Sequence, residues 1–369
     1  MKVLILANNS LGLYRFRGAL IRELLKKGHT VYASTPRNDH YDDLERMGVQ
    51  MLETFIDRRG TNPLADMRLS RTYRRMLREI QPDLVMTYTI KPNVYGGYAA
   101  RRAGIPYVVN VTGLGTSFQK AGLLRRVVTM LNRRGLKRAS VVFFENSANR
   151  DIFCRLGIVG EDVCHVLHGA GVDMEAFPKK PYPTDDRECE TRFLFVGRVM
   201  KEKGIDELFT AMRRLREEGS ACTLHIVGDY EDNYREAIEQ GERAGWLVYH
   251  GYQTDVPSFM QNTHCLVLPS YHEGMANVNL EAAATGRPLI TSRIPGCMEA
   301  VREGETGFLC EAQDAESLYD CMSRFLRLSR AEREAMGMAG HAYMVETFDK
   351  RKVVAETLEV LHRQTGLQL

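Results

Sequence analysis

The chain has 369 residues, of which 44% are hydrophobic and 26% are charged, and its formal net charge is only +3. This length favours two domains, no apolar run approaches the roughly 20 residues of a membrane-spanning helix, and the opening MKVLILANN predicts a strand rather than a signal peptide. The eight cysteines lie scattered without a C-x-x-C or a paired-histidine spacing, which argues against a structural zinc site and predicts reduced thiols in a cytoplasmic protein.

Short apolar segments rich in β-branched residues alternate with helical patterns along the whole chain. The first half contains six candidate strands, at 2–7, 29–35, 50–56, 83–89, 106–112 and 140–146. The second half contains another six, at 192–197, 223–228, 247–252, 264–270, 288–293 and 307–312. This alternation favours parallel sheets with helices on both faces. Neither half has G-x-G-x-x-G after its first strand and no P-loop sequence is present, which argues against a dinucleotide fingerprint.

The pattern therefore predicts an α/β protein with two doubly wound, Rossmann-like domains. Prolines and dense charge mark a linker between them. We expect an N-terminal domain at 1–175, the linker at 176–191, a C-terminal domain at 192–345 and a final helix at 346–369.

Loops after the strands of the first half carry glycine, basic and polar residues. Gly12 lies at the mouth of the first sheet, with Arg15 and Arg17 just inside a helix. This arrangement suits close approach of a diphosphate, and it equally suits two arginines on an exposed helix face. Further candidates for contacts with a ligand at this edge follow the fourth and fifth strands: Lys91, Asn93, Thr112, Gly113 and Gly115.

The stretch 84–144 contains no acidic residue but ten basic ones, which points to an anionic partner. Within it, 122–138 predicts an amphipathic helix whose apolar face holds Leu123, Leu124, Val127, Val128 and Leu131. The basic residues expected at an anionic membrane surface are Arg125, Arg126, Arg133 and Arg134. A helix packed on its own sheet, with an ordinary charged back, would have the same pattern.

Charged residues also follow two strands of the second half. Arg198 and Lys203 come after 192–197, and Glu273 and Glu281, eight residues apart, come after 264–270. Either pair alone would commonly be interpreted as charged residues on the exposed surface of a helix. In an open α/β sheet, however, side chains just past the carboxyl ends of the strands line the ligand crevice.

Residues around the acidic pair favour a ligand site. Gly274 permits a tight turn, and a helix that starts near Ala276 or Asn277 and stops at Gly286 offers its N–H groups to an anion. Two cations and two anions at one crevice suit a ligand that has a diphosphate at one end and hydroxyls at the other, as a sugar nucleotide has.

The segment 192–302 resembles the donor-binding domain of family 4 glycosyltransferases of the GT-B fold, which are recognised by E-x7-E and an upstream Arg/Lys pair. Segments 87–100 and 109–118 are similar to the branch that extends undecaprenyl-diphosphate-linked sugars, to which the PglA-type N-acetylgalactosaminyltransferases belong. The match covers nearly the whole chain.

The resemblance implies a role for each motif. Arg198 and Lys203 would hold the donor diphosphate, Glu273 a hydroxyl of the transferred sugar, and Glu281 the ribose. Other donor contacts would come from Gly197, Tyr252, Gly274, Met275, Ala276 and Asn277, with the N–H groups of residues 274–276 at the diphosphate. The loop departs from the common EGFG at Ala276, which leaves the donor sugar open, and Thr112 stands where other branches have a histidine.

The resemblance also implies a fold and an activity. Its two domains would face a central cleft, with the final helix crossing back to the first. The expected reaction is retaining, metal-independent transfer of GalNAc, Gal or GlcNAc from a UDP-sugar to a polyprenyl-diphosphate-linked sugar during bacterial glycan assembly, at the cytoplasmic face of the plasma membrane and without nucleic acid. The alternatives are a UDP-sugar 2-epimerase of the same fold and a non-catalytic protein that binds anionic lipid or nucleic acid.

Overall fold

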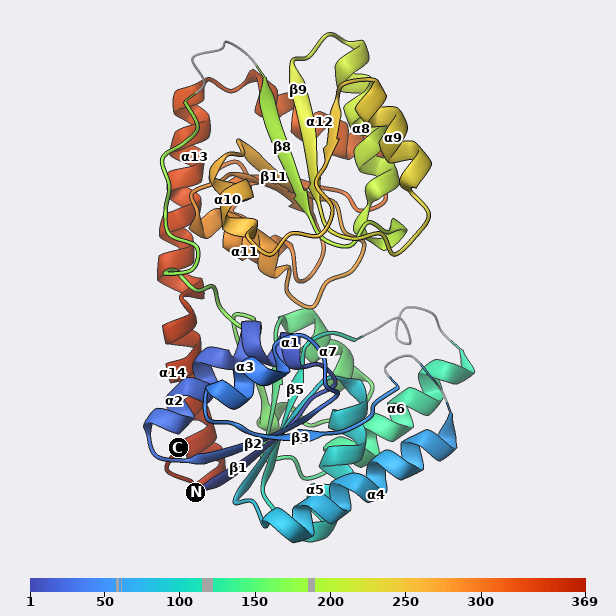
Figure 1. Ribbon diagram of the computed structural model, residues 1–369, viewed down its shortest axis with the longest axis vertical. Coiled ribbons are helices and arrows are strands. Elements are labelled where there is room, and N and C mark those ends of the chain that lie inside the picture. The colour runs from blue at the N-terminus through green and yellow to red at the C-terminus, as the bar shows by residue number, and fades with distance from the viewer. Residues whose placement is uncertain (58–59, 61, 115–121, 185–189) are drawn as a thin grey trace. The chain divides into compact units, whose positions relative to one another are not determined.

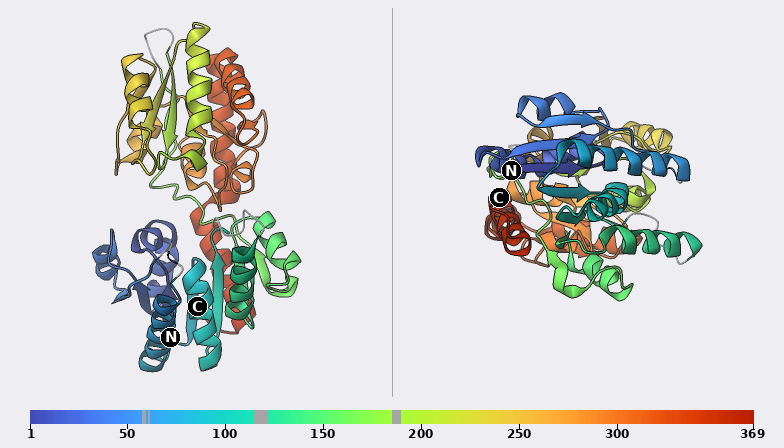
Figure 2. Two further views of the ribbon diagram at one scale, coloured as in Figure 1. Left: turned by 90° about the vertical axis from the view of Figure 1, so that its right-hand side faces the viewer. Right: turned by 90° about the horizontal axis from the view of Figure 1, so that it is seen from below.

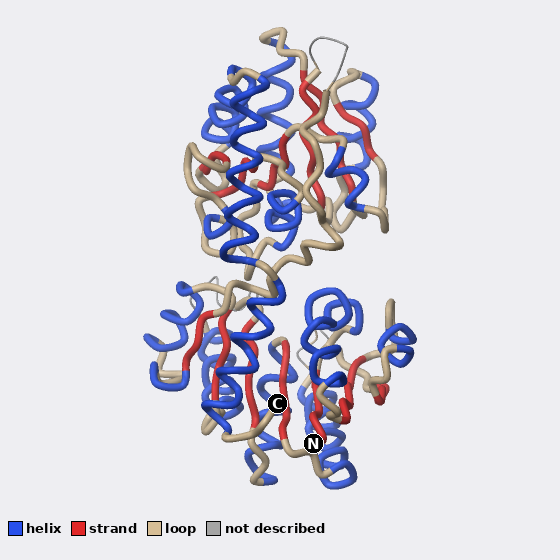
Figure 3. Tube along the Cα trace, turned by 90° about the vertical axis from the view of Figure 1, so that its left-hand side faces the viewer, coloured by secondary structure: helices blue, strands red, loops and turns tan. Residues whose placement is uncertain are grey.

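The computed structural model describes residues 1–57, 60, 62–114, 122–184 and 190–369. The chain divides into two compact units: unit 1 is Met1–Ala170 with Arg351–Leu369, and unit 2 is Gly171–Lys350. Each unit is a sheet between helices (Figure 1), and the strands, red in Figure 3, lie inside the helices of their own unit. The two chain termini lie near each other in unit 1 (Figure 2).

Unit 1 contains a seven-stranded sheet in the order β3-β2-β1-β4-β5-β6-β7, in which every pair is parallel. Its strands are β1 (Lys2–Leu6), β2 (Thr30–Thr35), β3 (Gln50–Glu53), β4 (Leu84–Tyr88), β5 (Tyr107–Val111), β6 (Val141–Phe144) and β7 (Cys164–Val166). Its helices are α1 (Ser10–Gly12), α2 (Gly18–Lys26), α3 (Tyr41–Arg46), α4 (Pro63–Ile80), α5 (Gly97–Ala103), α6 (Leu123–Leu136) and α7 (Ser147–Arg155), with π-helical turns η1 (Leu13–Arg17) and η2 (Pro92–Gly96) and the 3-10 turn η4 (Glu161–Val163).

Alternate side chains of these strands pack against different helices, because successive Cβ atoms point to opposite faces of a sheet. Val3 and Ile5 join the core cluster that includes α2 and the C-terminal helix α14 (Lys350–Thr365). Leu4 and Leu6 join the cluster on the other face, where α4, α5 and α6 form one layer. These two layers bury the sheet and leave its carboxyl edge to the loops.

Unit 2 contains a six-stranded parallel sheet in the order β10-β9-β8-β11-β12-β13. Its strands are β8 (Thr191–Val196), β9 (Cys222–Val227), β10 (Leu247–Tyr249), β11 (Cys265–Leu268), β12 (Leu289–Ser292) and β13 (Gly307–Cys310). Its helices are α8 (Ile205–Glu217), α9 (Arg235–Arg243), α10 (Val256–Gln261), α11 (Asn277–Ala284), α12 (Ala315–Arg327) and α13 (Arg330–Tyr343), with short turns η5 (Lys201–Lys203), η6 (Met298–Ala300) and η7 (Met344–Phe348).

The expected linker, 176–191, falls inside unit 2, and its described part packs there. Arg287 is fully buried and donates to Pro181 O at 2.7 Å and to Met260 O at 2.9 Å. Burial lowers the pKa of this guanidinium to about 10. A buried charge requires hydrogen-bonding partners, so Arg287 holds the 176–191 segment against α10. The composition of the segment did not predict this contact.

The predicted fold class is confirmed, and each of the twelve expected strands is present. The prediction missed β7, which is only three residues long and half-buried, too short for a periodic pattern. The units divide at 170/171 and 350/351, where the sequence suggested 175/176 and 345/346, and Arg351–Leu369 counts with unit 1. None of the described helices is long and apolar enough to cross a membrane.

Candidate functional site

The loops after β8 and β11 lie side by side at the carboxyl edge of unit 2, because these strands are neighbours in the sheet. Lys203 Nζ donates to Glu273 Oε1 at 2.5 Å, and the two side chains are only 19% and 15% exposed. Tyr271 N–H donates to Glu202 O at 2.9 Å and ties the same two loops together. The structure therefore brings together two charged motifs that lie seventy residues apart in the sequence.

Arg198 forms an ion pair with Glu231, which follows β9. The arginine side chain is 54% exposed, while Glu231 is largely buried. The two loops approach closely because Gly228, with φ +147°, has no side chain: a Cβ there would lie 1.9 Å from Gly197 O. Sequence reasoning missed Glu231, although its place after an apolar strand was a usable signal. An anion held by Arg198 would compete with this carboxylate.

The loop after β11 is held in place by the loop after β12. Gly296 has φ +89°, and a Cβ on it would lie 2.7 Å from Glu273 O. Its carbonyl accepts from Ala276 N–H at 2.7 Å, and its N–H donates to Glu299 Oε2 at 2.7 Å. Burial raises the pKa of the Glu299 carboxyl. These contacts fix the backbone that carries Glu273.

This arrangement gives one of the expected donor contacts another partner. The Ala276 N–H donates to Gly296 O, so it would have to leave that bond to meet a diphosphate. In the described part of the chain, the Met275 N–H has no such partner. Helix α11 starts at Asn277 as predicted, and its N-cap, Ala276, provides no side-chain cap. The positive end of α11 therefore has no side-chain cap, although the N–H groups of Asn277 and Asn279 donate to Met275 O and Ala276 O.

The other predicted donor residues lie at the same edge of the sheet. Glu281 is half-buried on the second turn of α11, and Tyr252 is exposed in the loop after β10. Asn277 donates from Nδ2 to Met275 O at 3.3 Å, so its amide folds over the loop that carries Glu273.

Several buried polar atoms near this edge have no hydrogen-bond partner within the described residues. They are Ser270 Oγ, Asn277 Oδ1, Asn279 Oδ1 and Ser292 Oγ. Native proteins satisfy most buried polar atoms, so a cluster of exceptions marks a place where something else bonds. Cys297 is buried beside the Lys203–Glu273 pair, and burial together with the Glu273 charge raises the pKa of its thiol. This cysteine is consequently an inert packing residue.

At the carboxyl edge of unit 1, Arg17 Nη2 donates to Glu145 Oε1 at 2.6 Å, with side chains 11% and 12% exposed. The guanidinium lies 5.1 Å from the centre of the Tyr88 ring. Burial raises the pKa of Glu145, and Arg17 opposes that shift. Arg17 is therefore not on an exposed helix face, and sequence reasoning missed Glu145, the first acidic residue after the acid-free stretch. Gly12 and Arg15 stand in the same segment, α1 and η1.

Lys91 and Asn93 follow β4, as expected. Lys91 Nζ pairs with Asp66 Oδ1 of α4 at 2.7 Å, so its charge is already matched. Asn93 is buried, donates to Asn110 O at 2.9 Å and leaves Oδ1 without a partner in the described chain. Thr89 has φ +73°, and its buried Oγ1 is also unpaired there. Strained residues and π-turns such as η2 are enriched at functional sites.

Thr112 and Gly113 come directly after β5, and Gly115 lies outside the described residues. In α6, Leu124 and Val127 are exposed together with Met130, while Val128 packs on the core. The apolar side of α6 is thus divided between the core and the surface. Arg126, Arg133 and Arg134 are exposed and Arg125 is half-buried, so the outer side of α6 is both basic and apolar.

Two family profiles match the chain. The profile described as "Glycosyl transferases group 1" matches residues 178–342, and the profile described as "Glycosyl transferase 4-like domain" matches residues 12–170. Together they cover most of unit 2 and most of unit 1.

Curated relatives extend over most of the chain. The N,N'-diacetylbacillosaminyl-diphospho-undecaprenol alpha-1,3-N-acetylgalactosaminyltransferase of Campylobacter jejuni is 25% identical over 340 residues, which are 88% of this chain and 89% of that protein. The UDP-Gal:alpha-D-GlcNAc-diphosphoundecaprenol alpha-1,3-galactosyltransferase of Escherichia coli is 28% identical over 307 residues, 79% of this chain and 77% of that one.

Among solved structures, Anabaena Alr3699/HepE in complex with UDP is similar, with a TM-score of 0.78 and 20% identity over 98% of this chain and 100% of that one. The same protein with UDP-glucose gives a TM-score of 0.77 and 19% identity, covering 97% and 99% of the two chains. At this identity the likeness shows the fold.

Proposed function

Because the chain belongs to the group 1 glycosyltransferases of family 4, a family of retaining hexosyltransferases with the GT-B fold, we propose that it transfers a sugar from a UDP-sugar to a polyprenyl-diphosphate-linked sugar. The sugar would be GalNAc, Gal or GlcNAc, and the product would serve bacterial glycan assembly. The observation that carries the donor half of this proposal is the contact between Lys203 and Glu273.

This contact supplies both kinds of group that a sugar nucleotide needs. Lys203 is a compact cation for a diphosphate, and Glu273 is an acceptor for a sugar hydroxyl. The N-terminus of α11, which has no side-chain cap, lies after the same loop and favours negative charge. Uridine is supported by the UDP and UDP-glucose bound in the Anabaena protein of the same fold.

The chemistry that these residues can perform is electrostatic. As the bond between the sugar and the diphosphate opens, negative charge grows on the diphosphate, and preorganised cations stabilise that charge more than they stabilise the substrate. Arg198, Lys203 and the α11 terminus would supply this stabilisation without a metal ion. The departing phosphate would accept the proton of the incoming hydroxyl, so no carboxylate nucleophile is required.

The polyprenyl-diphosphate acceptor is supported by the two curated relatives, whose names specify undecaprenol-linked substrates. In unit 1, Gly12 and the exposed Arg15 of the adjacent turn suit a diphosphate. The exposed basic and apolar side of α6 suits an anionic membrane, as a lipid-linked acceptor requires. We therefore place the protein at the inner face of the plasma membrane as a peripheral protein.

A UDP-sugar 2-epimerase of the same fold is the alternative. It would release no transfer product and would need no lipid-linked acceptor. The exposed apolar residues of α6 argue against it, since an enzyme that acts only on soluble nucleotides has no use for them.

The test is a transfer assay with UDP-GalNAc, UDP-Gal and UDP-GlcNAc and an acceptor carrying a sugar on polyprenyl diphosphate. We expect one donor to give a lengthened lipid-linked product with release of UDP. Lys203→Ala should lower turnover by on the order of 10²-fold or more, while Lys201→Ala, an exposed lysine of the same turn, should not. Epimerised donor without lengthened lipid, or equal turnover of the two lysine variants, would contradict the proposal.

A further inference from the structure

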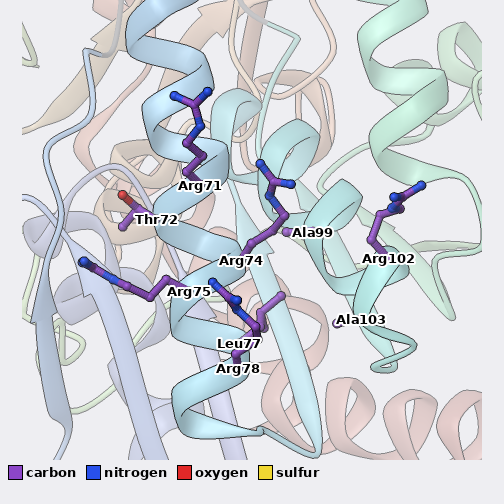
Figure 4. Close-up of a pocket in the computed structure, with 9 residues that line it drawn as sticks. All are labelled: Arg71, Thr72, Arg74, Arg75, Leu77, Arg78, Ala99, Arg102 and Ala103. Carbon is purple, nitrogen blue, oxygen red and sulfur yellow. The ribbon is translucent and has the colours of Figure 1, made fainter.

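A groove of about 650 Å³ lies between α4 and α5 on the outer side of unit 1. Arg71, Arg74, Arg75 and Arg78 of α4 line one side, and Arg102 of α5 stands across from them, with Ala99 between (Figure 4). The α4 residues lie outside the acid-free stretch at 84–144, so the sequence did not single them out.

Among the residues that the structure describes, no carboxylate lines this groove. Within the described chain, Arg75 has a distant partner, Glu79 at 3.9 Å, and Arg71, Arg74, Arg78 and Arg102 make no ion pair. A row of exposed arginines on one helix is usually a solvated surface. Here the cations come from two helices and line one hollow, an arrangement whose mutual repulsion an anion would relieve.

The surroundings of the groove indicate which anion. Helices α4, α5 and α6 cover the same face of the sheet and share one core cluster, and α5 contacts both α4 and α6 (Figure 1). Their outer sides expose five large apolar residues: Leu64 and Met67 on α4, and Leu124, Val127 and Met130 on α6. Soluble anions need no apolar neighbours. A membrane surface presents phosphate and hydrocarbon together.

We propose that this arginine groove binds the phosphate of an anionic phospholipid headgroup, so that unit 1 meets the membrane through α4 and α5 as well as α6. Guanidinium groups suit this partner because each donates two parallel hydrogen bonds to a phosphate. The inference deepens the proposed membrane location and rests on it. The groove is separate from the residues assigned to donor and acceptor.

The first experiment measures binding to vesicles of phosphatidylcholine with and without phosphatidylglycerol. Replacing Arg71, Arg74 and Arg102 by glutamine should weaken binding to the phosphatidylglycerol vesicles by about fivefold per arginine, or about a hundredfold together. The matched control replaces three exposed arginines of unit 2, Arg213, Arg243 and Arg327, by glutamine. An equal loss of vesicle binding in the control would show that only net charge matters, and it would contradict the proposal that the groove binds phosphate.

The second experiment separates a built site from diffuse charge. Arg71→Lys, Arg74→Lys and Arg102→Lys together keep the charge but lose the planar fork. We expect this triple variant to bind the anionic vesicles several-fold more weakly than the wild type. Binding equal to that of the wild type would contradict the proposal that the groove is a specific phosphate site.

A third measurement distinguishes failure of this inference from failure of the proposed function. With donor and acceptor in detergent, the glutamine triple variant should transfer sugar at the wild-type rate, because none of the three residues lies at either sheet edge. If that variant instead loses binding to a single-stranded oligonucleotide and keeps vesicle binding, the partner is nucleic acid and the phospholipid inference is wrong, whatever the transfer assay shows.

Discussion

At the carboxyl edge of unit 2, Lys203 and Glu273 join loops that follow adjacent strands, and Arg198 reaches solvent. At the same edge of unit 1, Arg17 reaches from η1 past Tyr88 at the end of β4 to Glu145 after β6, and that pair is buried. The first arrangement keeps charge available to a ligand, whereas the second uses charge to hold the edge together.

The largest expected effect is on the stability of unit 1. Glu145→Ala leaves Arg17 buried without its partner, which should lower the free energy of unfolding by about 3–5 kcal/mol. Denaturant unfolding measures this, with the exposed Glu161→Ala as control. The joint change Arg17→Met with Glu145→Leu should recover most of the loss. If Glu145→Ala unfolds like Glu161→Ala, the pair does not hold this edge and the contrast between the units disappears.

In unit 2 the backbone of the loop that carries Glu273 depends on a close contact with a glycine. Gly296→Ala adds left-handed strain of about 1–2 kcal/mol and a clash with Glu273 O. Gly304→Ala is the matched control, because its φ is +77° and a Cβ there meets nothing within 4 Å. Both should lose stability through the strain, Gly296→Ala should lose more because of its clash, and only Gly296→Ala should also lose turnover. Equal turnover of the two variants would show that the contact does not position Glu273.

The Arg198–Glu231 pair of unit 2, which is partly exposed, should give a small effect of opposite sign. Glu231→Gln removes the carboxylate that competes for Arg198, so UDP should bind more tightly, by about 0.2–1 kcal/mol, as is typical of exposed pairs. Calorimetric titration at low salt checks this, with Glu236→Gln, an exposed glutamate of α9, as control. Weaker UDP binding by Glu231→Gln would show that Glu231 helps to hold the ligand.

Buried carboxyl groups at both edges predict that the free energy of unfolding depends on pH, and the direction of this dependence follows from their raised pKa values. The pKa of Glu299 is raised by burial, so in the window between its unfolded value and the raised folded value the native state binds more protons. Stability should therefore fall as pH rises through that window. Glu299→Gln still accepts from Gly296 N–H but cannot titrate, so its thermal unfolding should show a smaller fall. An unchanged pH profile would contradict this.

The two edges also differ in how far the sequence predicted them. The strand pattern predicted twelve strands, and the Arg/Lys and E-x7-E motifs predicted Lys203 beside Glu273, because their loops follow adjacent strands of a regular sheet. Glu231 and Glu145 were missed, since each pairs with an arginine distant in sequence. The α4 arginines were missed because they line a groove with Arg102 only once α4 and α5 pack together. The bond from Ala276 N–H to Gly296 O was not anticipated, because a backbone contact has no side-chain signature.

The most direct test of the donor site compares two glutamate variants by calorimetric titration with UDP. Glu281 is assigned to the ribose, so Glu281→Ala should lose about 1.5–3 kcal/mol of UDP affinity, the usual loss for a charged hydrogen bond. Glu273 is assigned to the transferred sugar, so Glu273→Ala should bind UDP almost as the wild type does and yet turn over slowly. If Glu273→Ala loses UDP as severely as Glu281→Ala, the two carboxylates do not divide a sugar nucleotide in this way.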